Sequence, residues 1–476
     1  MDVVRLHRPH GTPEAALSIV GVLGFLTIVL VALVLLHGYI WWRLVRSTTV
    51  PGRTRRRLTL LTVALALLPA AAVALRRTLS PDAAAPLDWI AYSWLGLSFY
   101  LFLALLALEP VRLALRPWTK QRAATTSPDP ELERQAEEVV PSGARRAPSD
   151  GEPEGIPSGA LWAPGRDDAT AQPERGTAIG RDAVRKDGDA QSEVTDPSRR
   201  IFLARSLAAT AGVVALGTAG TGAYFANSAP VVERVPITLR GLDPALDGFR
   251  IVTFSDAHLS STYGGRRFER LVEITNAQRP DVVAIVGDLV DGSVEDLRED
   301  VAPLQDLVSD QGVFFVTGNH EYFVDTEGWL RHLETLGVDV LRNERVTLSR
   351  GGATVDLAGI DDRTAASSGV PGHGADLDAA LDGRDGGTPV VLLAHQPYMV
   401  PLAAAAGVDL QLSGHTHGGQ LWPFDYAIRL DQPAVEGLSR HGDTQLYVTR
   451  GAGYWGPAMR IGARPEVTVV ELRSPA

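Results

Sequence analysis

The sequence predicts an α-helical transmembrane region followed by a soluble α/β domain. Three observations lead to this prediction. Uncharged apolar runs fill much of the first quarter of the 476-residue chain, strand-like and helix-period stretches alternate over its second half, and Asp, Asn or His follows several of the strands. Runs of about 20 apolar residues are typical of membrane spans. Alternating strands and helices are typical of a sheet covered by helices.

The composition limits the class of protein. Hydrophobic residues make up 45% of the chain and the mean hydropathy is +0.03, which is high for a wholly soluble protein. The formal net charge of -11 gives no indication of nucleic-acid binding, so no nucleic-acid partner is expected. The chain has no cysteine, which excludes disulfides, thiolate metal ligands and a cysteine nucleophile.

Residues 1–118 are predicted to form a membrane region with three transmembrane helices. The apolar runs that predict them are Ala15–Trp42, Leu58–Leu75 and Trp89–Leu108. Arginine clusters follow the first and third runs, and the positive-inside rule places both clusters in the cytoplasm. The N-terminus is therefore predicted to face out. A buried helical bundle of a soluble domain is the alternative interpretation of these runs.

Two segments connect this region to the second half of the chain. Residues 119–197 are rich in Pro, Gly, Ala, Ser and acidic residues and show no apolar period, which predicts a disordered linker. Residues 198–230 contain Arg199-Arg200 before an Ala/Gly-rich apolar run. This pattern is similar to a twin-arginine export signal, and a fourth transmembrane helix is the alternative. Both interpretations send the rest of the chain to the extracytoplasmic side.

Residues 231–476 are predicted to form one soluble α/β domain. The strand-like runs are, in chain order, Arg250–Phe254, Val282–Val286, Val313–Thr317, Thr354–Ala358, Val390–Ala394, Leu410–Leu412, Leu446–Thr449 and Val467–Leu472. The stretches with helical periodicity between them are Arg267–Ala277, Val294–Val308 and Gly328–Leu336. This alternation predicts helices packed on sheets.

Polar loops that follow five of these strands are candidates for a functional site. Ligands bind at the carboxyl ends of strands in open α/β sheets, so parallel neighbours would bring these loops to one rim. The candidate ligands there are Asp256, His258, Asp288, Asn319, His395, His415 and His417. Such ligands suit Mn, Fe or Zn, with Mg as a further candidate. Seven are too many for one ion and suit two, about 3.5–4 Å apart and bridged by a carboxylate, which can hold a phosphoryl group and generate hydroxide.

The order of these motifs resembles the calcineurin-like metallophosphoesterase superfamily, in the version that is similar to bacterial membrane-associated phosphodiesterases. The motifs are D-x-H, G-D-x-x-D, G-N-H-E, a lone H and G-H-T-H-G-G-Q, followed by R-G-x-G, and they lie between Phe249 and Leu472. The resemblance implies a four-layer α/β/β/α sandwich, two divalent metal ions and hydrolysis of phosphoesters. It implies one ion on Asp256, His258, Asp288 and His417, and a second on Asp288, Asn319, His395 and His415.

Four further polar residues lie close to these motifs. The resemblance implies that His320 contacts the phosphate and either stabilises charge or protonates the leaving oxygen. Asp291 either supports the site or caps the following helix. Glu321 either orients His320 or is a solvated loop residue. Arg450 is a candidate substrate-binding residue that either clamps a phosphate or pairs with a surface carboxylate.

Aromatic residues follow the metal motifs at Trp422, Tyr426, Tyr454 and Trp455. Core packing is the first expectation for them, and an apolar wall that faces the substrate is the alternative.

The chain as a whole is predicted to be a membrane-anchored phosphoester hydrolase, a phosphodiesterase in which a metal-bridging hydroxide attacks phosphorus. Its catalytic domain is expected on the extracytoplasmic side of the cytoplasmic membrane, with a lipid or envelope precursor as the substrate. A phosphomonoesterase, and a non-catalytic metal-binding scaffold or sensor at the membrane, are the alternatives.

Overall fold

The computed structural model describes residues 13–76, 78–119 and 197–475. The chain divides into two compact units, which are Met1–Ala114 with Ile201–Ala476, and Leu115–Arg200. The linker predicted at residues 119–197 lies almost wholly outside the described residues. In the smaller unit, the guanidinium of Arg199 lies 5.6 Å from the ring centroid of Trp118.

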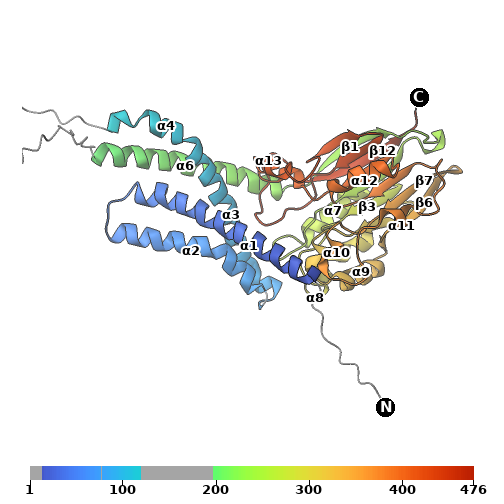
Figure 1. The fold of residues 1–476 in the computed structure, drawn as a ribbon, viewed down its shortest axis with the longest axis horizontal. Helices are drawn as coiled ribbons and strands as arrows, with labels where there is room; N and C mark the ends of the chain where they lie inside the picture. The colour runs from blue at the N-terminus through green and yellow to red at the C-terminus, as the bar shows by residue number, and fades with distance from the viewer. Residues whose placement is uncertain (1–12, 77, 120–196, 476) are drawn as a thin grey trace, which may run out of the picture. The chain divides into compact units, whose positions relative to one another are not determined.

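Four helices in the described part of the chain are long and apolar enough to cross a membrane. They are labelled in Figure 1 and comprise α1 (Pro13–Ile40), α2 (Arg53–Leu75), α3 (Pro81–Ala107) and α6 (Pro197–Ala226). The first three contain the apolar runs predicted from the sequence, apart from the last one or two residues of the first and third runs, and the fourth carries Arg199-Arg200 in its first turn. Shorter helical segments of this region are η1 (Trp41–Arg46), α4 (Glu109–Ala114) and η2 (Pro117–Thr119).

Ionic and apolar contacts hold these helices together. The carboxylate of Glu109 lies 2.5 Å from the guanidinium of Arg43 and 2.7 Å from that of Arg112. This pairing offsets the cost of placing these mostly buried charges between helices. Separately from this ionic network, Ala211 and Ala215 of α6 are fully buried in a cluster with apolar residues of α1 and α3. Small side chains of this kind let helix backbones approach closely.

Two six-stranded sheets lie at the centre of the remaining residues. The first sheet has the order β1 (Val231–Thr238), β12 (Glu466–Arg473), β2 (Phe249–Phe254), β3 (Val282–Val286), β4 (Val313–Val316) and β5 (Asp339–Val340). The second has the order β10 (Gly437–His441), β11 (Thr444–Val448), β9 (Leu410–Ser413), β8 (Val390–Leu393), β7 (Ala353–Gly359) and β6 (Glu344–Arg350). Strands β2 to β5 are parallel to one another, and so are β7, β8, β9 and β11.

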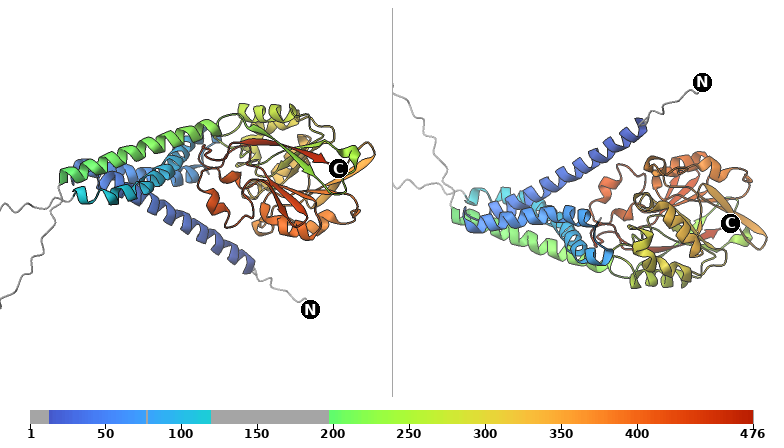
Figure 2. Two further views of the ribbon diagram at one scale, coloured as in Figure 1. Left: turned by 90° about the horizontal axis from the view of Figure 1, so that it is seen from above. Right: turned by 90° about the horizontal axis from the view of Figure 1, so that it is seen from below.

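The two sheets pack face to face, with helices on their outer sides, as Figure 2 shows. Alternate residues of a strand face opposite sides of its sheet. In β3, Val282, Ala284 and Val286 belong to the core between the sheets, whereas Val283 and Ile285 belong to the core under the helices. The resulting α/β/β/α sandwich confirms the predicted fold class.

The outer layers contain helices of different lengths. The first sheet is covered by α7 (Arg266–Asn276), α8 (Val294–Val301), η4 (Ala302–Asp306) and α9 (Thr326–Thr335), and the second by α11 (Leu377–Leu381) and α12 (Val400–Ala405). The helix predicted at Val294–Val308 is therefore shorter than expected, because Pro303 has no backbone N–H to continue it. The remaining segments are η3 (Pro244–Leu246), η5 (Glu321–Phe323), α10 (Ala365–Ser368), η6 (Pro397–Met399), η7 (His417–Gly419) and α13 (Asp425–Ile428).

Candidate metal centre and active site

The predicted ligands converge where the parallel strands end. Asp256, His258 and His417 form one group, and Asp288, His395 and His415 form another, with the candidate ligand atoms of each group all within 4.8 Å of one another. The loops after β2 and β3 of the first sheet and after β8 and β9 of the second supply them. The candidate ligands therefore lie together at the edge of the sandwich where the sequence predicts the site.

In the first group, three ring or carboxylate atoms face a common point. The Nε2 atom of His417 lies 3.3 Å from Oδ1 of Asp256, and Nε2 of His258 lies 4.0 Å from the same oxygen. The backbone N–H of His415 donates to the Asp256 carboxylate at 3.0 Å, which holds this carboxylate in the first sheet against the loop of the second.

Asp288 connects the two groups. Its Oδ2 lies 3.8 Å from Nε2 of His258 and 3.1 Å from Nε2 of His395. The Nδ1–H of His395 donates to the carbonyl of Val286 at 2.7 Å, so Nε2 of this ring presents its lone pair to the centre. This is the arrangement expected of a carboxylate that bridges two cations.

Two buried polar atoms test whether the residues fit a metal. Among the described residues, Oδ1 of Asn319 has no hydrogen-bond partner, and Nε2 of His395 has no polar contact apart from the carboxylate of Asp288 at 3.1 Å. Buried polar atoms nearly always have one, so a pair of them at the same place needs an explanation. Both are good ligands for a divalent cation, and both belong to the second predicted ligand group. The donor set therefore fits a pair of divalent ions.

The backbone holds most of these ligands in a strained conformation. Eight non-glycine residues of the described chain have positive φ, and five of them are candidate ligands. They are Asp256 (φ 54), His258 (φ 49), Asp288 (φ 52), His415 (φ 70) and His417 (φ 53). A positive φ costs free energy in a residue other than glycine. Such a conformation persists where the surrounding structure imposes it, most often at functional sites. The convergence of the ligands is thus built into the fold.

Asp291 orients two histidines. Its Oδ1 lies 2.8 Å from Nδ1 of His258 and 2.7 Å from Nδ1 of His320. Burial alone would raise the pKa of Asp291, but the two rings lower it well below its usual range, so the group is a carboxylate. A carboxylate only accepts hydrogen bonds, so each ring donates its Nδ1–H to Asp291. The Nε2 atom of each ring is therefore the one that can contact a metal ion or the substrate. The cap of α8 is Ser293 instead, whose hydroxyl accepts from Asp296 N, so the structure favours the supporting role of Asp291.

His320 has the properties of a proton donor. Burial by itself lowers the pKa of this imidazole, but the carboxylates of Asp288 and Asp291 more than reverse that effect and raise the pKa to about 9. Its ring is also flanked by two exposed aromatic rings, with centroids 5.2 Å away for Phe323 and 5.7 Å for Trp455. The His320 ring therefore lies between the candidate ligands and two exposed aromatic side chains.

Glu321 has a structural function that neither sequence interpretation described. The residue is fully buried, so it is not a solvated loop residue. Its carboxylate accepts from the backbone N–H groups of Gly318 at 2.7 Å, Leu289 at 2.8 Å and Asp288 at 3.0 Å. It therefore joins the loop after β3 to the loop after β4. The place of this glutamate directly after Asn319 and His320 is the only signal in the sequence.

Replacement of Glu321 by alanine is expected to destabilise the chain. The substitution leaves several buried N–H groups without an acceptor, at about 3 kcal/mol or more in total. That corresponds to a fall of roughly 6–12 °C in Tm for a domain of this size. Thermal unfolding of the purified full-length protein measures it, with Glu334→Ala on the exposed face of α9 as the matched control. Equal melting of the two variants would contradict this function of Glu321.

Two arginines lie behind the site. Arg450 Nε donates to Glu466, and its Nη2 lies 3.5 Å from Glu233, so the structure shows the pairing with carboxylates; binding of phosphate by Arg450 stays a prediction. Arg460, which the sequence analysis missed, is fully buried and donates to the carbonyls of His417 at 3.0 Å and Arg450 at 2.6 Å. Arg460 therefore connects its own C-terminal loop to the loop that carries His417. No motif in the sequence marks Arg460.

The aromatic residues divide between core and surface. The expectation of core packing is correct for Tyr454, which is 2% exposed. It is wrong for Trp422, Tyr426 and Trp455, which are 56%, 65% and 54% exposed. Trp422 and Trp455 lie in irregular segments and Tyr426 lies in the four-residue helix α13, which is too short for periodicity to indicate which way a side chain points.

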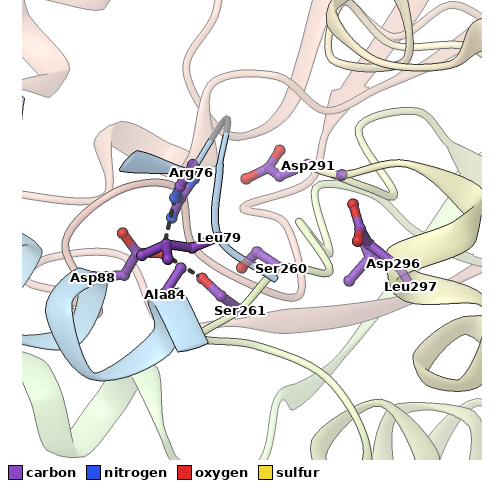
Figure 3. A pocket seen from close by; sticks show the side chains of 10 residues that line it. Arg76, Leu79, Ala84, Asp88, Ser260, Ser261, Asp291, Asp296 and Leu297 are labelled. Atoms are coloured by element: carbon purple, nitrogen blue, oxygen red, sulfur yellow. Dashed lines mark hydrogen bonds and ion pairs between the residues drawn. The ribbon is translucent and has the colours of Figure 1, made fainter. Parts of the chain in front are cut away.

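The helical region meets the catalytic loops at a pocket beside Asp291, shown in Figure 3. The carboxylate of Asp88 in α3 is fully buried there. Its Oδ2 accepts from Nε of Arg76 at 2.8 Å and from the hydroxyl of Ser261 at 2.6 Å. A charged group of α3 is thus bonded to the loop that follows the ligand His258.

Comparison with known proteins agrees with this geometry. The family model described as calcineurin-like phosphoesterase matches residues 249–419. A "Transmembrane protein with metallophosphoesterase domain" of Danio rerio is 41% identical over 259 residues, which cover 53% of this chain and 59% of that protein. The chain thus spans about three fifths of this relative's length.

Two further proteins extend the comparison. In the solved structure of the calcineurin-like phosphoesterase YfkN from Bacillus subtilis, 16% of the aligned residues are identical, the match covers 46% of this chain and 90% of that one, and the TM-score is 0.30. An "Uncharacterized metallophosphoesterase" of Helicobacter pylori strain J99 is 38% identical over 278 residues, covering 58% of this chain and 73% of that protein. The Helicobacter pylori relative, together with the family model, shows that the chain belongs to the calcineurin-like phosphoesterase family.

Proposed function

We propose that this protein is a membrane-anchored phosphodiesterase that depends on two divalent metal ions. The observation that carries the proposal is the convergence of two ligand groups on the shared carboxylate of Asp288, beside His320, which Asp291 orients. The first ion would be held by Asp256, His258, Asp288 and His417, and the second by Asp288, Asn319, His395 and His415. Mn, Fe or Zn suits these ligands, with Mg as a further candidate.

The residues around the ligands have different roles in the proposed reaction. When bound, two divalent ions supply a hydroxide near neutral pH and neutralise charge on the phosphoryl oxygens. The Nδ1–H of His320 donates to Asp291, so the second proton of the imidazolium, at Nε2, is the one given to the leaving oxygen. Asp291 fixes the tautomer of both His258 and His320. Glu321 keeps the loops of Asp288 and Asn319 in register.

The chain is proposed to cross the cytoplasmic membrane several times. Residues 1–118 supply three spans, and the arginine clusters place their inner ends in the cytoplasm. Residues 198–230 supply a fourth span with a twin-arginine-like start, and the burial of Ala211 and Ala215 against the other helices supports its retention as a span. The catalytic domain at 231–476 then lies outside, after the linker at 119–197. The printed name of the Danio rerio relative includes "transmembrane", which agrees.

Turnover of model substrates tests the catalytic part of the proposal. The full-length chain, purified in detergent and loaded with Mn, is expected to hydrolyse an activated phosphodiester faster than the matching monoester. A faster monoester would select the phosphomonoesterase alternative. If two metal ions are bound per chain and neither ester is hydrolysed, the protein is a scaffold or sensor and the proposed activity is wrong.

A reporter fused after the last residue tests the topology. Alkaline phosphatase, which is active only outside the cytoplasm, is expected to be active there, because an even number of spans follows an N-terminus that faces out. A cytoplasmic reporter at the same junction should be inactive. The reverse pattern would contradict the orientation and would leave the catalytic proposal untouched.

A further inference from the structure

Large apolar side chains gather on the surface directly after the metal loop. We call residues 422–430 the aromatic segment; in it Trp422, Phe424, Tyr426 and Leu430 are 56%, 55%, 65% and 90% exposed. Single exposed apolar residues are normal, but a contiguous group marks a surface that contacts something apolar. The segment begins three residues after Gly419, the end of η7. Whatever it contacts is therefore brought close to the metal centre.

Charged groups on the helices mark the depth of a membrane around them. Asp88 of α3 pairs with Arg76, and Glu109, the first residue of α4, pairs with Arg43 and Arg112 just beyond the other end of α3. The helix that separates the two acids is continuous over residues 88–107, which at 1.5 Å per residue is about 29 Å. This distance matches a hydrocarbon core of about 30 Å. The ion pair of Asp88 therefore marks the outer boundary of the core, on the side of the catalytic loops.

Part of the catalytic domain reaches below that boundary. Met459 packs so closely on Gly96 of α3 that a Cβ there would lie 2.6 Å from its Sδ, and Gly96 is eight residues, about 12 Å, beyond Asp88 toward Glu109. The next residues contact α6 as well. The backbone N–H of Arg460 donates to the carbonyl of Gly222 at 2.9 Å. The loop around Met459 thus lies at the depth of the outer acyl chains.

The aromatic segment is fastened to this loop. The backbone N–H of Trp422 donates to the carbonyl of Ile461 at 2.9 Å. Leu421 and Ile461 both pack against the apolar cluster of α1, α3 and α6. The exposed side chains that follow Leu421 are consequently continuous with the lipid-facing surface of the helices.

An apolar path leads from this segment to the active site. The side-chain amide of Gln420 donates to the carbonyls of Trp455 at 2.9 Å and Pro457 at 3.1 Å, which fixes the loop that carries Trp455. The Trp455 ring flanks His320, and so does the exposed ring of Phe323. An apolar leaving group between these two rings would lie beside the proton donor.

We propose that the aromatic segment inserts into the outer leaflet of the membrane that the four helices cross, and that the substrate is a phosphodiester whose leaving group carries acyl chains. This inference rests on the proposed function and names its substrate class. The oxygen of water joins phosphorus, the bond from phosphorus to the lipid alcohol oxygen breaks, and His320 supplies the proton to that oxygen. The acyl chains of the leaving group stay in the leaflet, in contact with the aromatic segment.

Insertion is measured by fluorescence, since the chain has no cysteine and accepts a single introduced one. Tyr426→Cys is labelled with an environment-sensitive fluorophore, and Asp310→Cys, exposed in the loop before β4, is the matched control. Each full-length variant is reconstituted into vesicles of phosphatidylcholine and phosphatidylglycerol that contain a spin-labelled lipid. Emission at position 426 is expected to fall about twofold, with no change at position 310.

Kinetics in the same vesicles test the substrate class. Phe424→Ser combined with Tyr426→Ser is expected to lower kcat/KM about tenfold for a phosphodiester lipid in the bilayer, and to change it less than about twofold for a water-soluble nitrophenyl diester. The control variant, Val308→Ser with Leu402→Ser, removes exposed apolar side chains elsewhere, which are 66% and 57% exposed. It should leave both activities unchanged.

Each contrary outcome would contradict one part of the proposal: the insertion, the substrate class or the proposed function. Absence of quenching at position 426 overturns the insertion, and so does self-quenching between labelled chains without lipid quenching, which would assign the surface to a second copy. An equal loss on both substrates overturns the lipid substrate class. If the unaltered chain hydrolyses neither substrate while position 426 is quenched, the proposed function fails and the insertion stands.

Discussion

Asp288→Asn is expected to lower kcat for an activated phosphodiester by at least about 10³-fold. The substitution removes the one charge that both ligand groups share, and the ions supply several kcal/mol of transition-state stabilisation, where about 4 kcal/mol corresponds to 10³-fold. Elemental analysis of the purified variant should find fewer than two metal ions per chain. Asp288 accepts a backbone N–H from His320 at 2.8 Å, which an amide oxygen still accepts, so the fold is expected to persist.

The matched control for this experiment is Asp310→Asn. Asp310 is exposed and precedes β4, at the opposite end of that strand from Asn319. Its variant should retain full activity and two ions. If Asp288→Asn also retained both, the assignment of Asp288 as the shared ligand would be wrong.

His320→Gln is expected to lower kcat by about 10²–10⁴-fold with both metal ions still bound, because a general acid contributes in that range. The loss should depend on the leaving group. A nitrophenolate leaves without a proton, so its ester should lose less than an alkyl ester, whose alkoxide needs one. Comparing the two esters separates proton donation by His320 from a merely structural role.

The control for this second experiment is His441→Gln. His441 lies in β10, at the edge of the second sheet and at the end remote from the ligand loops. It should change neither ester's turnover. An equal loss of both esters with His320→Gln would indicate that His320 stabilises charge on the phosphoryl group instead of donating a proton.

Local pattern was sufficient for most of the fold. All eight strands expected from the sequence exist, because β-branched runs such as Val282–Val286 are buried on both faces of a sheet. Strands β1, β5, β6 and β10 were not expected. They lie at or near the sheet edges, where one face meets solvent and polar residues interrupt the apolar pattern: β1 contains Pro236 and β5 has only two residues.

The site shows the same division. Asp256, His258 and Asp288 could be identified because a metal ligand needs a specific side chain at a specific place after a strand, and that leaves a motif. The contribution of Glu321 and Arg460 could not be read in this way. Both act by holding backbone groups of segments that are distant in sequence, such as Leu289 and His417, and a backbone group leaves no mark on the residue type.

The sequence by itself determined the family, the sandwich, the candidate metal ligands and the apolar helices, because each depends on residue types at short spacings. Only the tertiary structure decided which histidine rings Asp291 orients, which carboxylates hold Arg450 and which aromatic residues are exposed. It also placed Met459 against Gly96 of α3, next to the point where the aromatic segment is bonded to Ile461. These properties depend on the distance between segments that are remote along the chain, and packing alone determines that distance.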